Sequence, residues 1–422
     1  MKRIVFLSII SALAYSCGSL RMSYNQDMSY LYKRETVVLH PEMQAWHVSD
    51  VTTDIYFSIA SKELLYTKQQ GEADYTSRLL ISYRLTASYE SKVIIDSGFV
   101  KMQDVNNDNA TKLLNGKFTV KATKGANYLL KITFNDLNRN QKLEEYLDLY
   151  KVNSNTAQNF LTRSKETGSV LYRDNISAGE EVIITYKHTL QNKLFVKYYK
   201  KDFPIAAPPF SILDPRPFEI KPDSTFIVPL NDTGTYVSSF AKEGIYNFVS
   251  DTNQRDGLTL YRYNEGFPEV TRADQMLYPM RFITSKDEYD NINNSKNKKA
   301  AIESFWINCA GNQERAKEVI RKFYNRVKNS NIYFSSYLEG WKTDRGMIYL
   351  IFGPPNLVYK STDSETWVYG EDNNQNSLTL AFNKATNPFS DNDYVLQRST
   401  VYKSNWYRAV DIWRQGRIYL QN

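Results

Sequence analysis

Cysteine and histidine are scarce in this 422-residue sequence, which has two Cys and three His. So few thiols and imidazoles leave little material for a zinc or iron site. Beyond the N-terminus no apolar run approaches the ~18 residues that a transmembrane helix needs. Gly (17) and Pro (13) are too few for a collagen-like or low-complexity chain. The sequence also lacks a Gly-rich phosphate loop, GxSxG and HExxH, so no catalytic motif or cofactor site is expected.

The composition is that of a folded, β-rich protein. Hydrophobic residues make up 42% and charged residues 23%, which allows a packed core. The 32 Tyr and 21 Phe favour strands over helices. The net charge of +7 is weak for a nucleic-acid binder, which concentrates basic charge on one face, so no nucleic-acid partner is expected.

The N-terminus resembles a bacterial lipoprotein signal. Lys2 and Arg3 precede an apolar run at 4–14 that is too short to span a bilayer, and Ser16 stands directly before Cys17. The resemblance implies cleavage before Cys17, acyl chains on that residue and stable anchoring, since two or three chains hold far better than one. The alternative is an ordinary secretory signal with an incidental cysteine.

This prediction makes 1–16 the signal peptide and 17–35 a tether to an outer membrane. The residues after Cys17 lack the acidic run associated with surface export, which favours the periplasmic face over the cell surface. With Cys17 carrying lipid, only Cys309 remains, so no intramolecular disulfide can form.

Two β units are predicted before a change of periodicity. Residues 36–203 show alternating apolar and polar residues and predict an antiparallel β-sandwich. Its expected strands are 54–59, 78–84, 92–96, 116–121, 128–134, 181–186 and 193–198. Residues 204–270 predict a Pro-rich linker and a small β domain, because proline removes ladder donors. Its expected strands are 224–228, 244–249 and 257–262.

Residues 271–422 predict an α+β domain with helices before and after a small sheet. Apolar residues recur at helical spacing over 300–307 and 313–327. The strands expected after them are 347–352, 366–369, 378–382 and 394–397, and a closing helix is expected at 402–414.

The segment 340–346, GWKTDRG, followed by Gly353-Pro354-Pro355, resembles the signature of the GWxTD-domain family of Bacteroidota. Further segments match in order: Phe305-Trp306, 323–327 with Asn331 and Phe334, 365–369, and Trp406 to Gly416. The resemblance implies a secreted or lipid-anchored envelope protein and carries no established enzymatic activity. The motif residues that form a candidate binding surface are Gly340, Trp341, Thr343, Asp344, Arg345, Gly346, Glu365 and Trp367.

Each motif residue also has a structural interpretation. Gly340 suits a positive φ, and Gly346 allows close backbone approach before a strand. Trp341 fills a seam between sheet and helix. Thr343 and Asp344 bond backbone N–H groups. Arg345 pairs with Glu365 or Asp344.

Other candidate sites have a plainer explanation. Asp136, Asn138 and Asn140 have calcium-loop spacing, but Gln141 and Leu147 stand where that loop needs Gly and an acid, so a polar turn is expected. Cys309 lacks a nearby base, because His40, His47 and His188 all lie in the first block. The pairs Glu144-Glu145 and Glu180-Glu181 are expected to be solvated strand ends or turns. Taken together, these candidates predict no metal site and no catalytic residue.

The sequence therefore predicts a lipid-anchored, non-enzymatic binding or scaffold protein of an outer-membrane assembly for secretion, motility or outer-membrane biogenesis. Its expected partners are envelope proteins. One alternative is a glycan-binding lipoprotein, with Tyr and Trp side by side on a β face. The other is an enzyme with a site around Asp344, Arg345 and Glu365.

Overall fold

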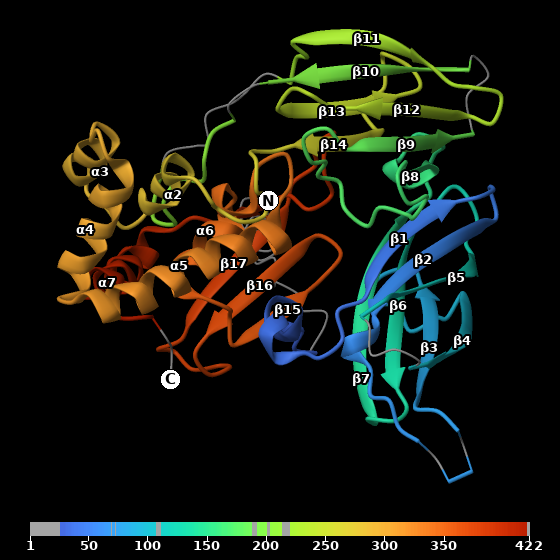
Figure 1. Cartoon of the computed structure of the whole chain (residues 1–422), viewed down its shortest axis with the longest axis horizontal. Coiled ribbons are helices and arrows are strands. Elements are labelled where there is room, and N and C mark those ends of the chain that lie inside the picture. The colour runs from blue at the N-terminus through green and yellow to red at the C-terminus, as the bar shows by residue number, and fades with distance from the viewer. Residues whose placement is uncertain are drawn as a thin grey trace, which may run out of the picture.

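The computed structural model describes residues 26–419 except 69, 72, 107–110, 188–191, 201–202 and 213–219. Three parts are visible in Figure 1: strands β1–β7 on one side, strands β8–β14 above, and the helices with strands β15–β18 on the other side. All strands pair antiparallel within their sheets.

The first part is a β-sandwich of two sheets ordered β1-β2-β5 and β4-β3-β6-β7. One hydrophobic core lies between them, with Ile55, Phe57 and Phe134 fully buried. Its strands are β1 (Glu42–His47), β2 (Thr52–Ala60), β3 (Thr76–Thr86), β4 (Asp96–Val105), β5 (Leu113–Lys121), β6 (Asn127–Asp136) and β7 (Gln141–Tyr150).

The second part pairs a sheet β11-β10-β13-β14 with a sheet β12-β9-β8 around its own core. Its strands are β8 (Phe160–Ser164), β9 (Glu181–Tyr186), β10 (Lys193–Tyr199), β11 (Ser224–Pro229), β12 (Thr235–Ser239), β13 (Gly244–Val249) and β14 (Leu258–Arg262). The sequence prediction divides these strands at residue 204, whereas the structure pairs them across it. Sequence order alone does not show which strands share hydrogen bonds.

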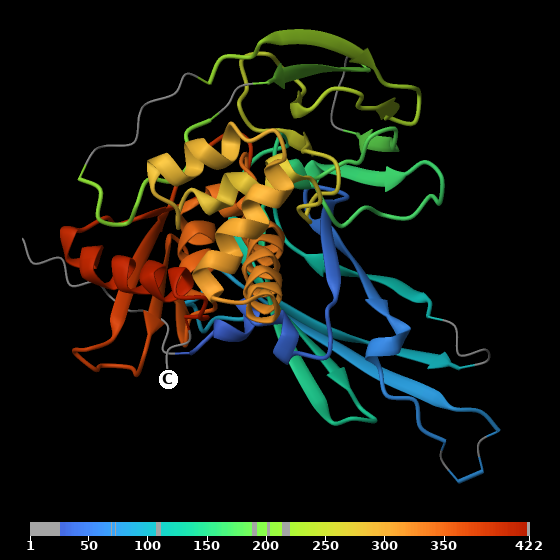
Figure 2. The same cartoon turned by 60° about the vertical axis from the view of Figure 1, so that its left-hand side comes forward.

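The third part is α+β, as predicted, and has six α-helices and a four-stranded sheet β15-β16-β17-β18 among the described residues. The helices are α2 (Ala273–Met280), α3 (Lys286–Asn293), α4 (Lys298–Ala310), α5 (Gln313–Phe334), α6 (Asp344–Phe352) and α7 (Lys403–Arg414). The strands are β15 (Leu357–Lys360), β16 (Ser364–Tyr369), β17 (Leu378–Lys384) and β18 (Tyr394–Leu396). Figure 2 shows the same parts from another side, with helix α7 in red at the left-hand edge.

Short polar side chains set the starts of these helices. Ser285 accepts a hydrogen bond from the Glu288 backbone N–H, and Asn312 accepts one from Arg315. Each side chain satisfies a donor that the first turn leaves without a partner. Short 3₁₀ turns occur at Ser29–Tyr32 (η1), Arg34–Thr36 (η2), Ser61–Glu63 (η3), Ala157–Asn159 (η4), Gly340–Lys342 (η5) and Thr400–Tyr402 (η6).

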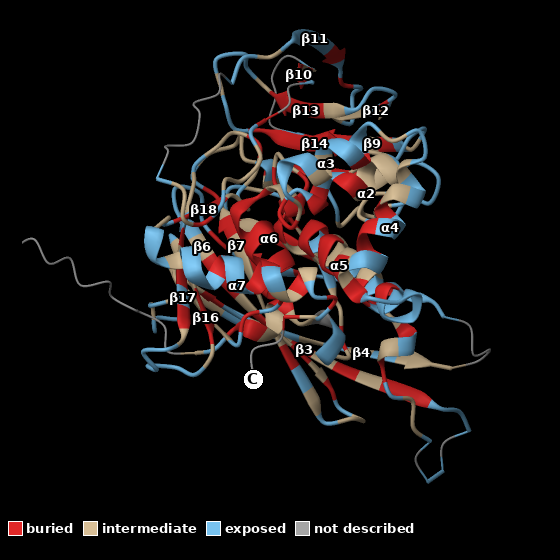
Figure 3. Ribbon diagram, turned by 90° about the vertical axis from the view of Figure 1, so that its left-hand side faces the viewer, coloured by how far each residue is buried: buried red, intermediate tan, exposed pale blue. Residues whose placement is uncertain are grey.

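Two predicted strands are wrong. Residues 347–352 form the end of helix α6, every residue of which is buried (Figure 3). The segment 347–352 is buried on all sides and is apolar throughout, so it lacks the polar face that would reveal a helical period. The strand expected at 92–96 instead begins at Asp96 and runs to Val105 as β4.

Candidate functional site

The GWxTD motif forms a 3₁₀ turn, η5, that leads into helix α6. Thr343 is the N-cap residue: its Oγ1 accepts a hydrogen bond from the Gly346 N–H at 3.1 Å and donates one to the Gly340 carbonyl at 2.8 Å. Asp344 Oδ2 accepts from the Leu396 N–H at 2.8 Å. Both side chains thus bond backbone N–H groups, and they fix the turn between α5 and α6 and its contact with β18.

The two motif glycines are needed for space. A Cβ at Gly340 would lie 1.8 Å from the Ser330 carbonyl oxygen, and a Cβ at Gly346 would lie 1.8 Å from that of Gly340. The predicted positive φ at Gly340 is wrong, and the positive value instead occurs at Gly353, which ends α6 with φ 85°. Close approach of α5, η5 and α6 therefore requires glycine at both motif positions.

Arg345 and Glu365 form an ion pair in the interior, with side chains that are 2% and 0% exposed. Arg345 Nη1 lies 3.0 Å from Glu365 Oε1. The other terminal nitrogen, Nη2, donates to the Asn392 carbonyl at 3.0 Å and also to the Asn392 side chain. The guanidinium stacks 4.0 Å from the ring centroid of Tyr394.

Glu365 has further partners in two other segments and in its own strand, β16. Tyr32 Oη bonds its two oxygens at 2.9 and 2.8 Å, and Lys360 Nζ lies 3.0 Å from Oε1. The Trp367 indole N–H donates to Oε2 at 3.1 Å. Burial raises the pKa of Glu365, but the charges of Lys360 and Arg345 and these hydrogen bonds outweigh it and lower the pKa to about 2. We call Tyr32, Arg345, Lys360 and Glu365 the buried network.

Asp344 belongs to a different contact, although it precedes Arg345 in sequence. Its carboxylate pairs with Arg398, whose Nη1 lies 3.1 Å from Oδ2. Successive helical residues point about 100° apart, so Asp344 and Arg345 face different neighbours. The motif acids and arginine therefore do not converge on one point.

Trp341 and Trp367 are core residues, 3% and 0% exposed. Trp367 packs against the ring of Phe382, with centroids 4.9 Å apart, and against Tyr32 at 5.3 Å. Trp341 meets Phe282, which follows α2, at 6.2 Å. The two indoles therefore hold the helices, the sheet and the N-terminal segment together.

Two cavities that share part of their lining lie beside the motif. The first, the strap cavity, measures about 580 Å³ and lies between the extended segment 204–207 and the motif residues Lys342, Thr343 and Asp344. The segment is fixed there, because the Ala206 N–H donates to the Lys342 carbonyl at 2.8 Å. Arg345 and Glu365 do not line this cavity.

The second, the tyrosine cavity, measures about 500 Å³ and shares Arg281, Lys342 and three other lining residues with the first. It lies between the β13–β14 end of the second part, helices α2 and α3, and η5. Six aromatic residues with polar atoms line it: Tyr199, Tyr263, Tyr278, Tyr289, Tyr337 and Trp341.

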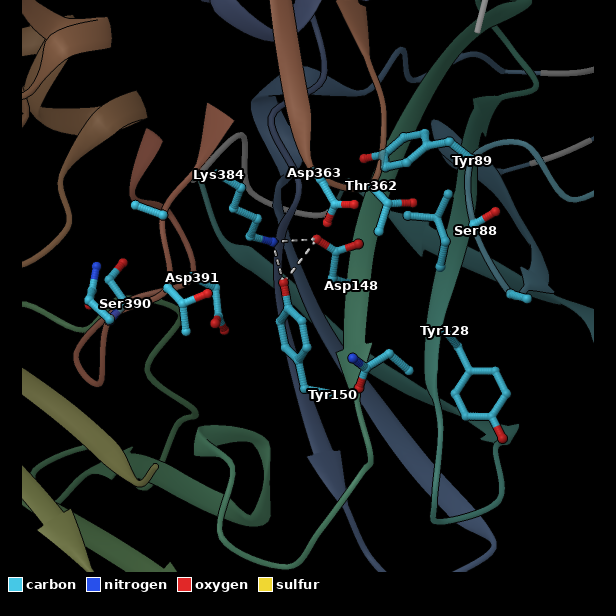
Figure 4. A pocket seen from close by; sticks show the side chains of 16 residues that line it. Ser88, Tyr89, Tyr128, Asp148, Tyr150, Thr362, Asp363, Lys384, Ser390 and Asp391 are labelled. Atoms are coloured by element: carbon cyan, nitrogen blue, oxygen red, sulfur yellow. Dashed lines mark hydrogen bonds and ion pairs between the residues drawn. The ribbon is translucent and has the colours of Figure 1, made fainter. Parts of the chain in front are cut away.

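A third hollow, the junction pocket of about 340 Å³, lies where the β6–β7 sheet meets the loops of the C-terminal sheet (Figure 4). Lys384 Nζ donates to Tyr150 Oη at 2.6 Å and lies 3.6 Å from Asp148, while Tyr150 Oη donates to Asp148 at 3.1 Å. These contacts cross from the first part to the third. Burial raises the pKa of Asp391, which also lines this pocket.

The remaining candidates have structural partners. Asp136 accepts from the backbone N–H groups of Leu65, Asn138 and Arg139, which makes the predicted polar turn. His40 contacts Glu63 at 3.1 Å, and His47 contacts Thr53 at 2.8 Å, while His188 lies outside the described residues. Among the residues described, no group of three His, Cys, Asp or Glu is arranged to hold a metal ion.

The predicted acidic pairs do not form a carboxylate couple. Glu144 pairs with Lys131 at 2.7 Å, Glu180 with Arg173 at 2.6 Å and Glu181 with Lys165 at 2.9 Å. Cys309 is a half-buried free thiol on α4, and burial raises its pKa, which disfavours the reactive thiolate.

Sequence reasoning missed Tyr32, Lys360, Asn392 and Arg398 as partners of the motif. Tyr32 is the most distant of these residues in sequence. It falls within 17–35, the segment that the sequence predicts to be a tether. From residue 26, where the description begins, this stretch is packed: Met28 and Tyr32 are buried in the C-terminal core, and the Met28 N–H donates to the Val358 carbonyl at 2.8 Å. The one available signal was the apolar character of Met28, Leu31 and Tyr32.

Cys17 lies outside the described residues. In the part of the chain that is described, no helix combines the length and the apolar character that crossing a bilayer requires.

Comparison with known proteins identifies a family for the C-terminal part of the chain. No curated protein matches this chain. One solved structure, the transglutaminase of red sea bream, aligns with 8% identity over 55% of this chain and 32% of its own, so the chain spans about a third of it. Its TM-score of 0.19 is too low to say anything of fold or activity. Residues 244–415 match the GWxTD domain family, so the match takes in β13 and β14 as well as the helices and the small sheet. The chain therefore carries a GWxTD domain at residues 244–415.

Proposed function

We propose that this protein is a lipid-anchored, non-enzymatic component of a bacterial outer-membrane assembly, held through acyl chains on Cys17 and acting as a binding or scaffold protein. The family setting suggests machinery for secretion, motility or outer-membrane biogenesis in Bacteroidota, with envelope proteins as partners. The sequence around Cys17 favours a periplasmic orientation.

The observation that carries the proposal is the place where the N-terminal segment attaches. Asp27 and Met28 bond the backbone of Val358 in β15, at 3.0 and 2.8 Å, and Tyr32 enters the buried network. A chain tethered at Cys17 would therefore transmit the position of the membrane directly into the GWxTD domain. Only nine residues separate Cys17 from Asp27, so the domain would lie close to the lipid surface.

The charged groups of the motif are bonded to other groups of the protein, and this supports a non-enzymatic role. Catalytic acids and bases need access to a substrate. Glu365 is 0% exposed, and both its oxygens are bonded. The terminal nitrogens of Arg345 donate to Glu365, to the Tyr32 hydroxyl at 3.4 Å and to Asn392. Asp344, which does line a cavity, is neutralised by Arg398.

The anchor is tested by replacing Cys17 with Ser and separating soluble from membrane fractions. We expect the wild type in the membrane pellet and C17S in the soluble fraction, because loss of the thiol removes the site of acylation. The matched control is Cys309→Ser, which should remain in the pellet. If C17S stays in the pellet to the same extent as C309S, the anchor proposal fails.

The assembly role is tested by crosslinking intact outer membranes and purifying the protein with its neighbours. We expect the same envelope proteins to be recovered in repeated experiments with the wild type, and to be lost with C17S. Recovery of nothing beyond the background of an untagged strain would contradict a scaffold role while leaving the anchor result standing.

A further inference from the structure

Cationic side chains line one side of the tyrosine cavity, and they do not belong to the buried network. Arg262 ends strand β14 and lines the cavity, yet only 7% of this residue is exposed. Its Nη1 donates to the Tyr263 carbonyl, its Nε is buried with no hydrogen-bond partner, and no carboxylate pairs with it among the described residues. A desolvated guanidinium without a counter-charge is costly, so an anion in the cavity would relieve it.

Other cations point to the same ligand charge. Arg281 and Lys200 also line the cavity, and neither side chain has a hydrogen bond or ion pair within the described part of the chain. Lys342 differs, because its Nζ lies 2.6 Å from Glu339. Of the two carboxylates that line the cavity, only Glu243 has no ion-pair partner within the described residues. The unpaired groups therefore carry three positive charges against one negative charge.

The polar groups around these cations suit a hydroxylated ligand. The Tyr278 and Tyr289 hydroxyls have no hydrogen-bond partner in the described residues, and Glu243 offers an acceptor. Burial raises the pKa of the Tyr289 phenol while the nearby charge of Arg281 opposes the rise, so these two groups act on the same space. Sugar hydroxyls both donate and accept, and tyrosine rings offer flat apolar faces beside their polar tips.

We propose that the tyrosine cavity is a binding site for an acidic saccharide, whose carboxylate or phosphate lies against Arg262 and Arg281 and whose hydroxyls meet Tyr278, Tyr289 and Glu243. The cavity of about 500 Å³ is of the size that small-molecule ligands occupy. This inference stands independently of the lipid anchor, since none of its residues belongs to the N-terminal segment.

The experiment is calorimetric titration of the purified full-length protein with matched probes. Trigalacturonate is compared with its methyl ester, and glucose 6-phosphate with glucose, so that the neutral member of each pair lacks the anionic group. We expect binding of the charged member and at least about a tenfold weaker affinity for the neutral one, the effect of one charge-assisted hydrogen bond. Whichever charged sugar binds more tightly identifies carboxylate or phosphate as the preferred anion.

Three variants locate the site. Arg262→Met removes the buried charge and keeps an apolar stem, and Arg281→Gln removes an exposed charge that has no structural partner. Each should weaken binding of the charged sugar by about 10- to 100-fold. Arg321→Gln, on the exposed face of α5 and outside the lining, is the matched control and should bind as the wild type does.

Several results would overturn the proposal. One is equal binding of charged and neutral sugars, and another is no binding of any sugar by the wild type. Unchanged affinity in folded R281Q would do so even if R262M proved unstable. Hexaglutamate is the competitor for an acidic peptide: if it binds more tightly than both charged sugars and R281Q abolishes that binding, the ligand is a peptide and the saccharide assignment is wrong.

Discussion

Arg345 Nη1 and Glu365 Oε1 lie 3.0 Å apart in the interior of the GWxTD domain, with neither side chain more than 2% exposed. The arginine comes from the first turn of α6 and the glutamate from the middle of the sheet. This pair, with Tyr32 and Lys360, joins the helices, the sheet and the N-terminal segment at one point.

Replacing Glu365 with Gln should strongly destabilise the GWxTD domain. The substitution leaves Arg345 and Lys360 buried without a counter-charge, which costs about 3–5 kcal/mol. Urea unfolding followed by tryptophan fluorescence measures it, since five of the six Trp lie between 300 and 415. The control is Glu181→Gln in the exposed pair with Lys165, expected to cost less than about 1 kcal/mol. Similar small losses in both variants would contradict a structural role for the pair.

The same carboxyl should make stability depend on pH in the acid range. The pKa of Glu365 is about 2 in the folded protein and 4.5 ordinarily, so its contribution is fully present above pH 4.5 and is lost as the pH falls towards 2. The difference corresponds to about 3 kcal/mol. Unfolding free energies of wild type and E365Q, measured from pH 6 to 2, should converge at low pH. A gap that stays constant over that range would show that Glu365 does not carry the effect.

Gly346→Ala should disrupt the contact between η5 and α6. The added methyl group would lie 1.8 Å from the Gly340 carbonyl oxygen, and backbone on both sides prevents relief, so we expect a loss of more than about 3 kcal/mol. Gly311→Ala is the matched control. Its Cβ would meet nothing within 4 Å, and its φ of 80° limits the loss to about 1–2 kcal/mol. Thermal unfolding of both variants distinguishes the two costs, and an equal loss would refute the close-approach explanation.

Tyr32→Phe should loosen the N-terminal segment without changing its apolar packing. The hydroxyl bonds both oxygens of Glu365, so its loss costs about 1–3 kcal/mol. Limited trypsin digestion should then cut faster at Lys33, which follows this residue. Tyr75→Phe, at a site that is 56% exposed, provides the comparison. Identical digestion rates for Y32F and Y75F would separate Tyr32 from the attachment of this segment.

The sequence predicts correctly those elements whose pattern depends only on neighbouring residues. The helical stripe at 313–327 and the alternation at 128–134 were predicted correctly, because each is set by which face of its own element is buried. Residues 347–352 were predicted as a strand because a helix enclosed on every side shows no polar face. The same burial that makes α6 central to the domain removed its periodicity.

In the candidate site, too, the sequence predicts some contacts and gives no signal for others. The pairing of Arg345 with Glu365 was one of two options from sequence, and the alternative partner, Asp344, instead binds Arg398. Sequence spacing could not choose between them, because the choice depends on the direction in which α6 presents each side chain. Arg262 gave no signal at all, since an unpaired charge is recognisable only once the surroundings are known.

By itself the sequence determined the β-rich N-terminal region, the α+β C-terminal region and the GWxTD motif within it, because composition, periodicity and short motifs are written in neighbouring residues. Only the tertiary structure decided that Tyr32 reaches Glu365 across 333 positions, and that Arg262 faces a cavity shared with α2 and the motif turn. Burial and the pairing of charges depend on which distant segments pack together, and packing is a property of the whole chain.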